Sequence, residues 1–332
     1  MQEPLISVIL PTYNRADILH KSIKAVLEQS YHNLELIIID DGSTDETANL
    51  ITTITDSRIR YLQINENKGV ANARNEGVIS SRGELIAFAD SDDIWIPEKL
   101  ALQIHFLNKY PHLEIIFGDY LNINHLIKSQ NYGFQQNSPG MNLLGTRQLD
   151  EDSWEIIASA PEALLKSDFI ATPTVIMRAN VFIKTGYFNN TLLGGSDFEY
   201  WWRAAVIGVR FAYQTIPLII RHKIDNSITA QKTEFTPRLL QALQSCANIS
   251  QNFNHPELIR PLRKAQHRAW TALIWENGKR GEINMALIAF KNSLSFGNSF
   301  QAWIYAFLSL FGVAGIRFIK ELYSHFNKLR KC

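Results

Sequence analysis

Apolar and polar positions alternate along the first 120 residues in a pattern typical of strands followed by helices. Short, wholly apolar runs predict buried strands, and apolar residues spaced three or four positions apart predict amphipathic helices. The predicted order is strand 6–10, helix 19–27, strand 36–39, helix 47–54, strand 60–64, helix 70–81 and strand 85–89. These repeated β-α-β units predict an α/β fold with a doubly wound, mostly parallel mixed sheet and helices on both faces.

The pattern changes twice further along the chain. A polar segment at 128–152 is rich in Asn, Gln, Ser and Gly, and we expect it to be a mobile excursion over the site. From Pro237 the chain becomes helical, and small and apolar residues at 265–296 predict a helix-turn-helix that resembles a single tetratricopeptide-like unit. One such unit needs something to pack on. We therefore predict a catalytic domain at 1–230 and a helical C-terminal region at 231–332.

The helical region ends in an apolar stretch. Residues 302–316 are apolar except for Tyr305 and Ser309, and Lys320, Lys328, Arg330 and Lys331 follow. The stretch is shorter than the roughly 20 residues that span a bilayer. Three interpretations stay open for the segment near 302–319: a buried helix, a helix lying in the membrane interface with a basic flank, and a true span.

Bulk composition narrows the class of protein. Hydrophobic residues make up 46% and charged residues 20% of the chain, as in soluble globular proteins. With 33 basic and 32 acidic residues there is no basic excess, so we expect no nucleic-acid partner. Two cysteines, Cys246 and Cys332, form neither a disulfide framework nor a zinc pattern. Since the first residues also lack a signal peptide pattern, we expect a cytoplasmic protein, with peripheral association at the inner face of the cytoplasmic membrane left open.

Acidic residues cluster directly after the strand predicted at 85–89. The cluster is Asp90-Ser91-Asp92-Asp93. Carboxylates repel a diphosphate unless a hard divalent cation lies between them, so this turn predicts a site for Mg²⁺ or Mn²⁺ and a nucleoside diphosphate. The alternative is a solvated turn that caps the next helix.

A second acidic run, Asp40-Asp41-Gly42-Ser43-Thr44-Asp45, follows the strand predicted at 36–39. Gly42 permits a sharp turn, and one aspartate can accept a hydrogen bond from a base or a ribose hydroxyl. Ser43 or Asp45 can cap the following helix, and turn-and-cap chemistry alone is the alternative. The position of this run beside the first cluster favours a nucleotide site.

Four motifs occur in order at fitting intervals, and together they resemble the family 2 inverting glycosyltransferases of the GT-A fold. The resemblance extends to about residue 230 and leaves the last hundred residues uncovered. Two of the motifs are the acidic runs described above. The other two are Pro11-Thr12-Tyr13-Asn14-Arg15 and Asn67-Lys68-Gly69-Val70-Ala71-Asn72-Ala73-Arg74-Asn75.

The resemblance implies roles on the donor side. Thr12 and Tyr13 would flank a uracil-like base, and Asp41 would hydrogen-bond that base. Asp90 would lie near the ribose, and Asp92 would bind the metal directly. Asp93 would instead cap a helix. Arg74 would lie near the phosphates, or else pair on the surface with Glu76 or Glu84. The remaining positions expected to bind the nucleotide-sugar are Pro11, Arg15, Asn67, Gly69, Ser91 and His222.

The resemblance places the catalytic base in the segment 194–203. Asp197 matches the aspartate of the family's Glu-Asp pair, although Ser196 stands where the family more often has Glu. Alternatives are a plain N-cap role for Asp197 and Glu199 as the base. Trp201 and Trp202 lie about 100° apart on a helix, so we expect that they do not both face the core. One of them would stack on sugar, with core packing as the alternative.

Two further segments resemble the acceptor-side framework and the phosphate-facing strand of the family. The first comprises Thr172-Pro173-Thr174 and Gly186-Tyr187-Phe188. The second is Arg221-His222-Lys223, where the usual Arg-x-His spacing is broken, so which of the three faces the phosphates stays open.

The expected reaction is a single in-line displacement with inversion, catalysed by a hexosyltransferase-type enzyme. Asp197 would deprotonate the acceptor hydroxyl while the cation on Asp92 steadies the leaving diphosphate. A nucleotide-sugar donor, most simply a UDP-sugar, and a glycan or lipid-linked acceptor would be the partners, in polysaccharide or lipopolysaccharide synthesis. The alternatives are a non-catalytic sugar-nucleotide-binding protein of the same fold, or a nucleotidyltransferase.

Overall fold

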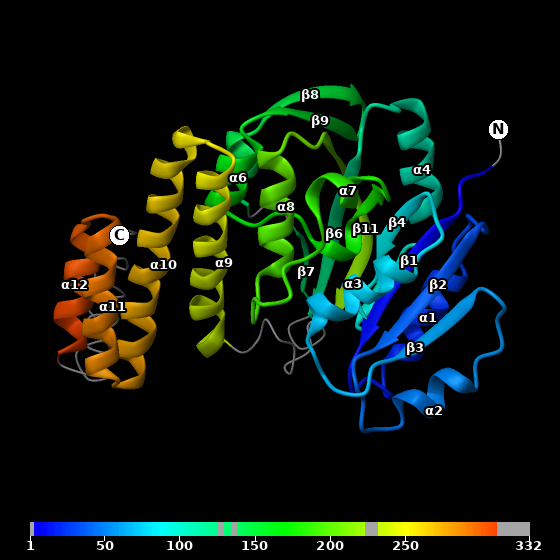
Figure 1. Cartoon of the computed structure of the whole chain (residues 1–332), viewed down its shortest axis with the longest axis horizontal. Helices are drawn as coiled ribbons and strands as arrows, with labels where there is room; N and C mark the ends of the chain where they lie inside the picture. Colours follow the sequence, from blue (N-terminus) through cyan, green and yellow to red (C-terminus); the bar gives the residue numbers. More distant parts are fainter. Residues whose placement is uncertain (1–2, 125–128, 134–137, 223–231, 311–332) are drawn as a thin grey trace, which may run out of the picture. The chain divides into compact units, whose positions relative to one another are not determined.

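The chain forms two compact units, residues 1–225 and 226–332. The computed structural model describes residues 3–124, 129–133, 138–222 and 232–310 (Figure 1).

The described strands of the first unit form one 11-stranded mixed sheet (Figure 1). Four parallel strands lie at one end, in the order β3 (Ile59–Gln63), β2 (Leu34–Asp40), β1 (Ile6–Thr12) and β4 (Leu85–Phe88). The order continues with β10 (Ile176–Arg178), β6 (Ile115–Asn124), β11 (Phe211–His222), β9 (Ser153–Ala158) and β8 (Gly145–Asp150). Two short strands lie off this path: β5 (Asp93–Trp95) pairs with β11, and β7 (Ser129–Tyr132) pairs with β6. This arrangement confirms the predicted α/β class.

Helices bury the parallel strands, as the apolar runs predicted. Every residue of β1 and β2 is buried. The predicted helices are present as α1 (Leu19–Leu27), α2 (Thr47–Thr52) and α3 (Val70–Ser80). Gly77 lets α3 pack closely on the sheet, because a Cβ there would lie 2.4 Å from Cγ2 of Ile9. The other α-helices described in this unit are α4 (Lys99–Lys109), α6 (Ala160–Lys166), α7 (Val181–Thr185) and α8 (Ser196–Val206).

The polar segment at 128–152 differs from its prediction, because it supplies strands to the sheet. It contains β7 and β8, with a short 3₁₀ helix at Met141–Leu143, while 134–137 lie outside the described residues. β8 is the last strand of the sheet, and Arg147 and Gln148 on it are exposed. An edge strand with one solvated side needs no apolar run, so the hydrophobic pattern did not reveal it.

The described part of the second unit is helical. Its α-helices are α9 (Lys232–Asn252), α10 (Ile259–Arg280), α11 (Ile283–Phe296) and α12 (Phe300–Ser309). The predicted helix-turn-helix is present as α10 and α11, joined at Gly281, whose φ of 75° is left-handed. α10 also packs against α9 and α12. Within the described residues no helix is both long and apolar enough to cross a membrane, and residues 311–332 lie outside them.

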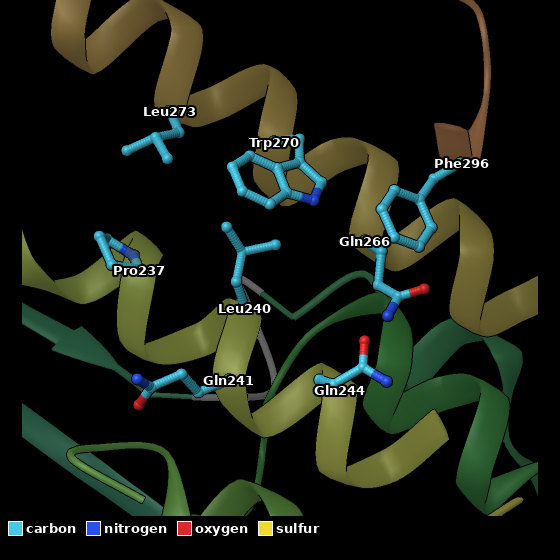
Figure 2. Close-up of a pocket in the computed structure, with 8 residues that line it drawn as sticks. All are labelled: Pro237, Leu240, Gln241, Gln244, Gln266, Trp270, Leu273 and Phe296. Atoms are coloured by element: carbon cyan, nitrogen blue, oxygen red, sulfur yellow. The ribbon is translucent and has the colours of Figure 1, made fainter. Parts of the chain in front are cut away.

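A recess of about 360 Å³ opens within this unit (Figure 2). Leu240 of α9 and Trp270 of α10 point toward one another across it, and three glutamines lie along one side (Figure 2). Its lining holds no ionisable side chain. The recess is therefore unsuited to a charged nucleotide, and the acidic cluster lies in the other unit.

Candidate active site

The acidic cluster lies just beyond β4. Asp90, Asp92 and Asp93 each offer a carboxylate oxygen, and these oxygens lie within 4.8 Å of one another. β4 runs parallel to β1, so the cluster lies at the same edge of the sheet as the first motif. This is the edge where ligands bind in doubly wound sheets.

Burial and mutual repulsion oppose ionisation of the carboxyl groups in this cluster. Burial raises the pKa of Asp92, and the charge of Asp90 raises it further, while Arg221 and Arg15 act in the opposite direction. Burial also raises the pKa of Asp93, whose Oδ2 is buried without a hydrogen-bond partner. An unpartnered buried carboxylate oxygen beside two other carboxylates fits the all-oxygen ligand set of a hard divalent cation.

The expected cap role of Asp93 is wrong, because Asp93 begins β5 and does not touch a helix end. In the sheet it lies opposite Arg221 of β11, whose Nε is 3.6 Å from Asp93 Oδ1. The following helix, α4, begins only at Lys99. The alternative of a solvated capping turn is therefore also wrong. The contact also places the Arg221 guanidinium at the acidic cluster. The side chain of His222, which ends β11, and all of Lys223 lie outside the described residues.

Arg74 connects the acidic cluster with the predicted base. Its side chain is only 5% exposed, and Nη2 donates to Asp90 Oδ1 at 3.0 Å. The other terminal nitrogen lies 4.0 Å from Asp197 Oδ2. The surface pairing with Glu76 or Glu84 is therefore wrong. A buried arginine between two carboxylates holds two distant parts of the chain in a fixed geometry.

Asp197 lies in the first turn of α8, with its side chain 37% exposed. It is not the N-cap, because Gly195 occupies that position. The hydroxyl of Thr172 donates to its Oδ2 at 3.4 Å, which brings the Thr172-Pro173-Thr174 segment to the site. Glu199 is unsuited to the role of base, because it is buried and paired with Arg203 at 3.0 Å. Asp197 is thus the accessible carboxylate of the segment.

Asp168 is a neighbour of Asp197 that the sequence analysis missed. Asp168 is an exposed residue. Burial of its carboxyl group and the charge of Asp197 raise the pKa of Asp168 to about 7. The residue belongs to none of the four motifs, and only the fold brings it to Asp197. No signal in the sequence pointed to it.

The expectation for the adjacent tryptophans is also wrong, because both are fully buried. Trp201 packs edge-on against Phe88 and Phe188, with ring centroids 6.4 and 6.0 Å apart. Trp202 is buried as well. α6 and α7 pack on α8, and Trp201 contacts Phe88 of β4, so two positions 100° apart can both lie in the interior. Neither ring is placed to stack on a sugar.

The donor-side residues predicted from β1, β2 and α3 gather at the same edge. Asp41 is buried and accepts hydrogen bonds from the backbone of Lys68 at 2.9 Å and Gly69 at 2.7 Å. It therefore fixes the turn at 67–69, where Gly69 has a φ of 89° and Asn67 is exposed. A base would use the remaining lone pairs of Asp41.

The end of β1 offers further groups for a nucleotide. Pro11 and Thr12 are buried, and the Thr12 hydroxyl has no hydrogen-bond partner, whereas Tyr13 is 43% exposed. Arg15 lies within electrostatic range of Asp92. Ser91 is half-buried between the cluster carboxylates. An exposed ring beside an unsatisfied hydroxyl is suited to a planar base with polar edges.

Asn75 ties α3 to the acceptor-side segment. Its Nδ2 donates to the backbone oxygen of Phe188 at 2.9 Å, and its Oδ1 accepts from the Phe188 backbone N–H at 3.0 Å. Arg203 of α8 donates to the backbone oxygen of Tyr187 at 2.9 Å. The segment 186–188 is therefore held from both α3 and α8.

Comparison with known proteins agrees with this geometry. Residues 7–159 match the family described as "Glycosyl transferase family 2". WfaP of Escherichia coli, named a UDP-Glc:alpha-D-GlcNAc-diphosphoundecaprenol beta-1,3-glucosyltransferase, is 42% identical over 118 residues, covering 36% of this chain and 45% of WfaP. An uncharacterized glycosyltransferase of Haemophilus influenzae is 31% identical over 211 residues, covering 62% of this chain and 61% of that protein. In the first three curated relatives, the match spans about half of the relative's length.

Solved structures show the same fold. S. aureus TarS 1–349 in complex with UDP has a TM-score of 0.61 at 17% identity, with 96% of this chain and 91% of that chain covered. The mannosyltransferase PcManGT of Pyrobaculum calidifontis, in complex with GDP-Man and Mn²⁺, has a TM-score of 0.56 at 18% identity, with 92% and 79% covered. These likenesses show that the chain has the fold of these solved structures, and that residues 7–159 are similar to glycosyltransferase family 2.

Proposed function

We propose that this chain is an inverting, metal-dependent glycosyltransferase that moves a sugar from a UDP-sugar to an acceptor hydroxyl. The observation that carries the proposal is the position of Arg74, which lies between Asp90 of the acidic cluster and Asp197. Arg74 thus brings the acidic cluster, which is suited to donor binding, next to Asp197, which is suited to base catalysis. Residues 1–230 form the catalytic domain in this proposal.

On the donor side, Asp92 is the proposed metal ligand, and Asp90 lies beside it toward the ribose. A divalent ion here would stabilise the negative charge that develops on the leaving diphosphate. Thr12, Tyr13 and Asp41 would hold the base. Arg15, Asn67, Gly69, Arg74, Ser91 and His222 complete the proposed donor site, with Pro11 shaping the end of β1.

On the acceptor side, Asp197 removes the proton from the attacking hydroxyl. Its carboxylate is accessible, and Arg74 and Thr172 hold Oδ2 in position. Attack from this side, opposite the leaving diphosphate, inverts the anomeric centre. The diphosphate leaves without protonation, so no second carboxylic acid is needed.

The proposed acceptor is a glycan carried on a lipid diphosphate. WfaP and WfgD of Escherichia coli, 42% identical to this chain over 118 and 124 residues, are named for a GlcNAc-diphosphoundecaprenol acceptor and a UDP-Glc donor. The chain would then act in polysaccharide or lipopolysaccharide synthesis, at the inner face of the cytoplasmic membrane.

The test is UDP release from UDP-glucose and UDP-GlcNAc, with Mn²⁺ and with a GlcNAc-diphospho-lipid acceptor. Asp197→Asn should lower transfer by about 10²–10⁴-fold, the usual contribution of a general base, because the amide cannot accept the proton. The same variant should still bind UDP, measured as a rise in unfolding temperature. Asp17→Asn, at an exposed aspartate, is the matched control and should transfer normally.

Two outcomes would refute the proposal. Full transfer by Asp197→Asn would remove Asp197 from the reaction. UDP binding by the wild-type chain with no turnover of UDP-, GDP- or TDP-sugars would leave a non-catalytic binding protein.

A further inference from the structure

The recess in the second unit is lined by one face of each of two helices (Figure 2). α10 contributes Gln266, Trp270 and Leu273, which are spaced by four and three residues, and α9 contributes Gln241 and Gln244 among others. Side chains at this spacing lie above one another on a helix, so each helix presents a continuous strip to the recess. All of the lining residues belong to the described part of the second unit, so the recess is a feature of that unit alone.

Gln266 is a polar side chain that the fold leaves without a partner. It is only 5% exposed, and its amide has no hydrogen-bond partner among the residues that the structure describes. It lines the recess, and in Figure 2 it extends from α10 toward Gln244 of α9. Buried amides are normally hydrogen-bonded, because burying one unpaired is costly. A buried, unpaired amide in the lining therefore indicates that the recess receives a group that can hydrogen-bond.

Trp270 supplies an apolar surface and a second unpaired donor. It is half-buried and packs, like Leu240, against the core of the unit. Its indole N–H has no hydrogen-bond partner within the described part of the chain. Phe296, the last residue of α11, adds another aromatic ring to the lining. The recess thus combines apolar rings with amide and indole groups that can donate and accept hydrogen bonds.

This lining selects a neutral ligand that has both apolar and polar surface. It holds no ionisable side chain, so a phosphate or an acidic sugar would lose water without gaining a counter-charge. A purely apolar chain would cover the Gln266 amide and the Trp270 N–H and leave both unpaired. A neutral sugar has C–H groups on the faces of its ring and hydroxyls at its edge, and each hydroxyl both donates and accepts. A neutral sugar therefore meets both requirements.

We propose that the recess between α9 and α10 binds one neutral sugar residue of a glycan, with the sugar ring against Trp270 and its hydroxyls on the amides of Gln244 and Gln266. The volume of about 360 Å³ is at the lower end of the roughly 300–1,000 Å³ of small-molecule sites, which suits a ligand of this size. The inference rests on the proposed function in one respect, since the acceptor glycan would supply this ligand. It adds a binding site whose residues all lie outside the proposed catalytic domain.

The experiment is a titration of the full chain with the neutral trisaccharide cellotriose, followed through the indole N–H signal of Trp270 in nuclear magnetic resonance spectra. This signal is the one that is missing from the spectrum of Trp270→Phe. We expect it to shift with a Kd on the order of 1 mM, since a few hydrogen bonds and one ring contact give weak binding. Trigalacturonate, in which every sugar residue carries a carboxylate, should bind at least about tenfold more weakly.

Two glutamine variants test the polar side of the recess. Gln266→Leu should raise the Kd for cellotriose about tenfold, because leucine is similar in size but cannot bond a hydroxyl. Gln244→Leu, at an exposed position, guards against misfolding of the first variant and should raise the Kd in the same direction. Gln251→Leu, at an exposed glutamine near the end of α9 that does not line the recess, is the matched control and should bind as the wild type does.

The titration contains no donor and no metal, so its result stands even if no sugar transfer is found. A wild-type chain that binds cellotriose at Trp270 but transfers no sugar would refute the proposed function and leave the binding site intact.

Three results would overturn the inference. The first is a Trp270 signal that cellotriose does not shift, or a Kd that neither Gln266→Leu nor Gln244→Leu raises. The second is equally tight binding of trigalacturonate, which would contradict the argument from the neutral lining. The third is a shift of the Trp270 signal with the prenyl alcohol geraniol but not with cellotriose, which would assign the recess to a lipid tail.

Discussion

Lys99, in the first turn of α4, is a fully buried lysine without a carboxylate partner among the described residues. Its Nζ donates to Gln103 Oε1 at 2.9 Å and lies 4.0 Å from the centre of the Trp95 ring. Burial lowers the pKa of Lys99 from 10.5 to about 7. A charged ammonium here has neither water nor a counter-ion to stabilise it.

Replacement by methionine keeps most of the buried stem and removes the charge. In wild type, the unfolded state binds the Lys99 proton more tightly than the folded state, so stability is lost as pH falls from 10.5 toward 7. The folded-state pKa of about 7 corresponds to a penalty of about 4 kcal/mol at pH 7 and about 2 kcal/mol at pH 9. Lys99→Met also leaves Gln103 Oε1 without its donor, which costs about 1–3 kcal/mol at either pH.

The pH dependence therefore isolates the effect of the charge. We expect the free energy of unfolding of Lys99→Met, relative to wild type, to be about 2 kcal/mol more favourable at pH 7 than at pH 9. Urea titrations of both proteins at pH 7 and pH 9 measure this difference in the free energy of unfolding. The unfolding transition of the first unit, which contains Lys99, is followed separately. The contributions of other titrating groups to the pH dependence cancel in this difference, because both proteins contain those groups. Lys24→Met, at a side chain 71% exposed, is the control and should change stability little.

A relative stability of Lys99→Met that is the same at pH 7 and pH 9 would refute the reasoning. It would mean that the amine of Lys99 stays protonated in the folded state across this range, as it does in the unfolded state.

Three further predictions concern the site. Asp92→Asn should lower UDP-sugar turnover by about 10²–10³-fold and raise the Mn²⁺ concentration needed for half-maximal rate, and an unchanged Mn²⁺ titration would contradict the assigned ligand. Arg74→Lys should reduce transfer by roughly tenfold or more, because one ammonium cannot contact both Asp90 and Asp197. Kinetics equal to those of the wild type would refute this bridging role. Asp168→Asn should remove an inflection near pH 7 from the pH–rate profile, since burial and the charge of Asp197 raise the pKa of Asp168 to about 7. A profile that keeps the inflection would assign it to another group.

The sequence was sufficient for those features that depend on neighbouring residues. The strands at 36–39 and 85–89 are each buried by covering helices, so their apolar runs were visible, and the acidic runs follow them directly. β8 stayed hidden, because an edge strand with a solvated side carries polar residues. Short-range pattern therefore found the parallel strands β1 to β4 but not the polar edge strand β8.

The features that the sequence did not reveal depend on residues far apart in the chain. We expected Asp93 to cap a helix, but the pairing between β5 and β11 places it opposite Arg221. The approach of α8 to α3 brought Asp197 to Arg74, and the same packing buried both tryptophans of α8. These contacts follow from tertiary packing, which no local spacing encodes.

The two hydrogen bonds between Asn75 and the backbone of Phe188 have a consequence for engineering. Asn75 is the residue after Arg74, so the segment 186–188 and the arginine between the two carboxylates share one rigid support. Attempts to broaden acceptor choice by remodelling 186–188 should therefore also lower the rate with the original acceptor. Libraries that keep the Phe188 backbone in place and vary exposed positions such as Tyr187 and Leu193 should retain more active members.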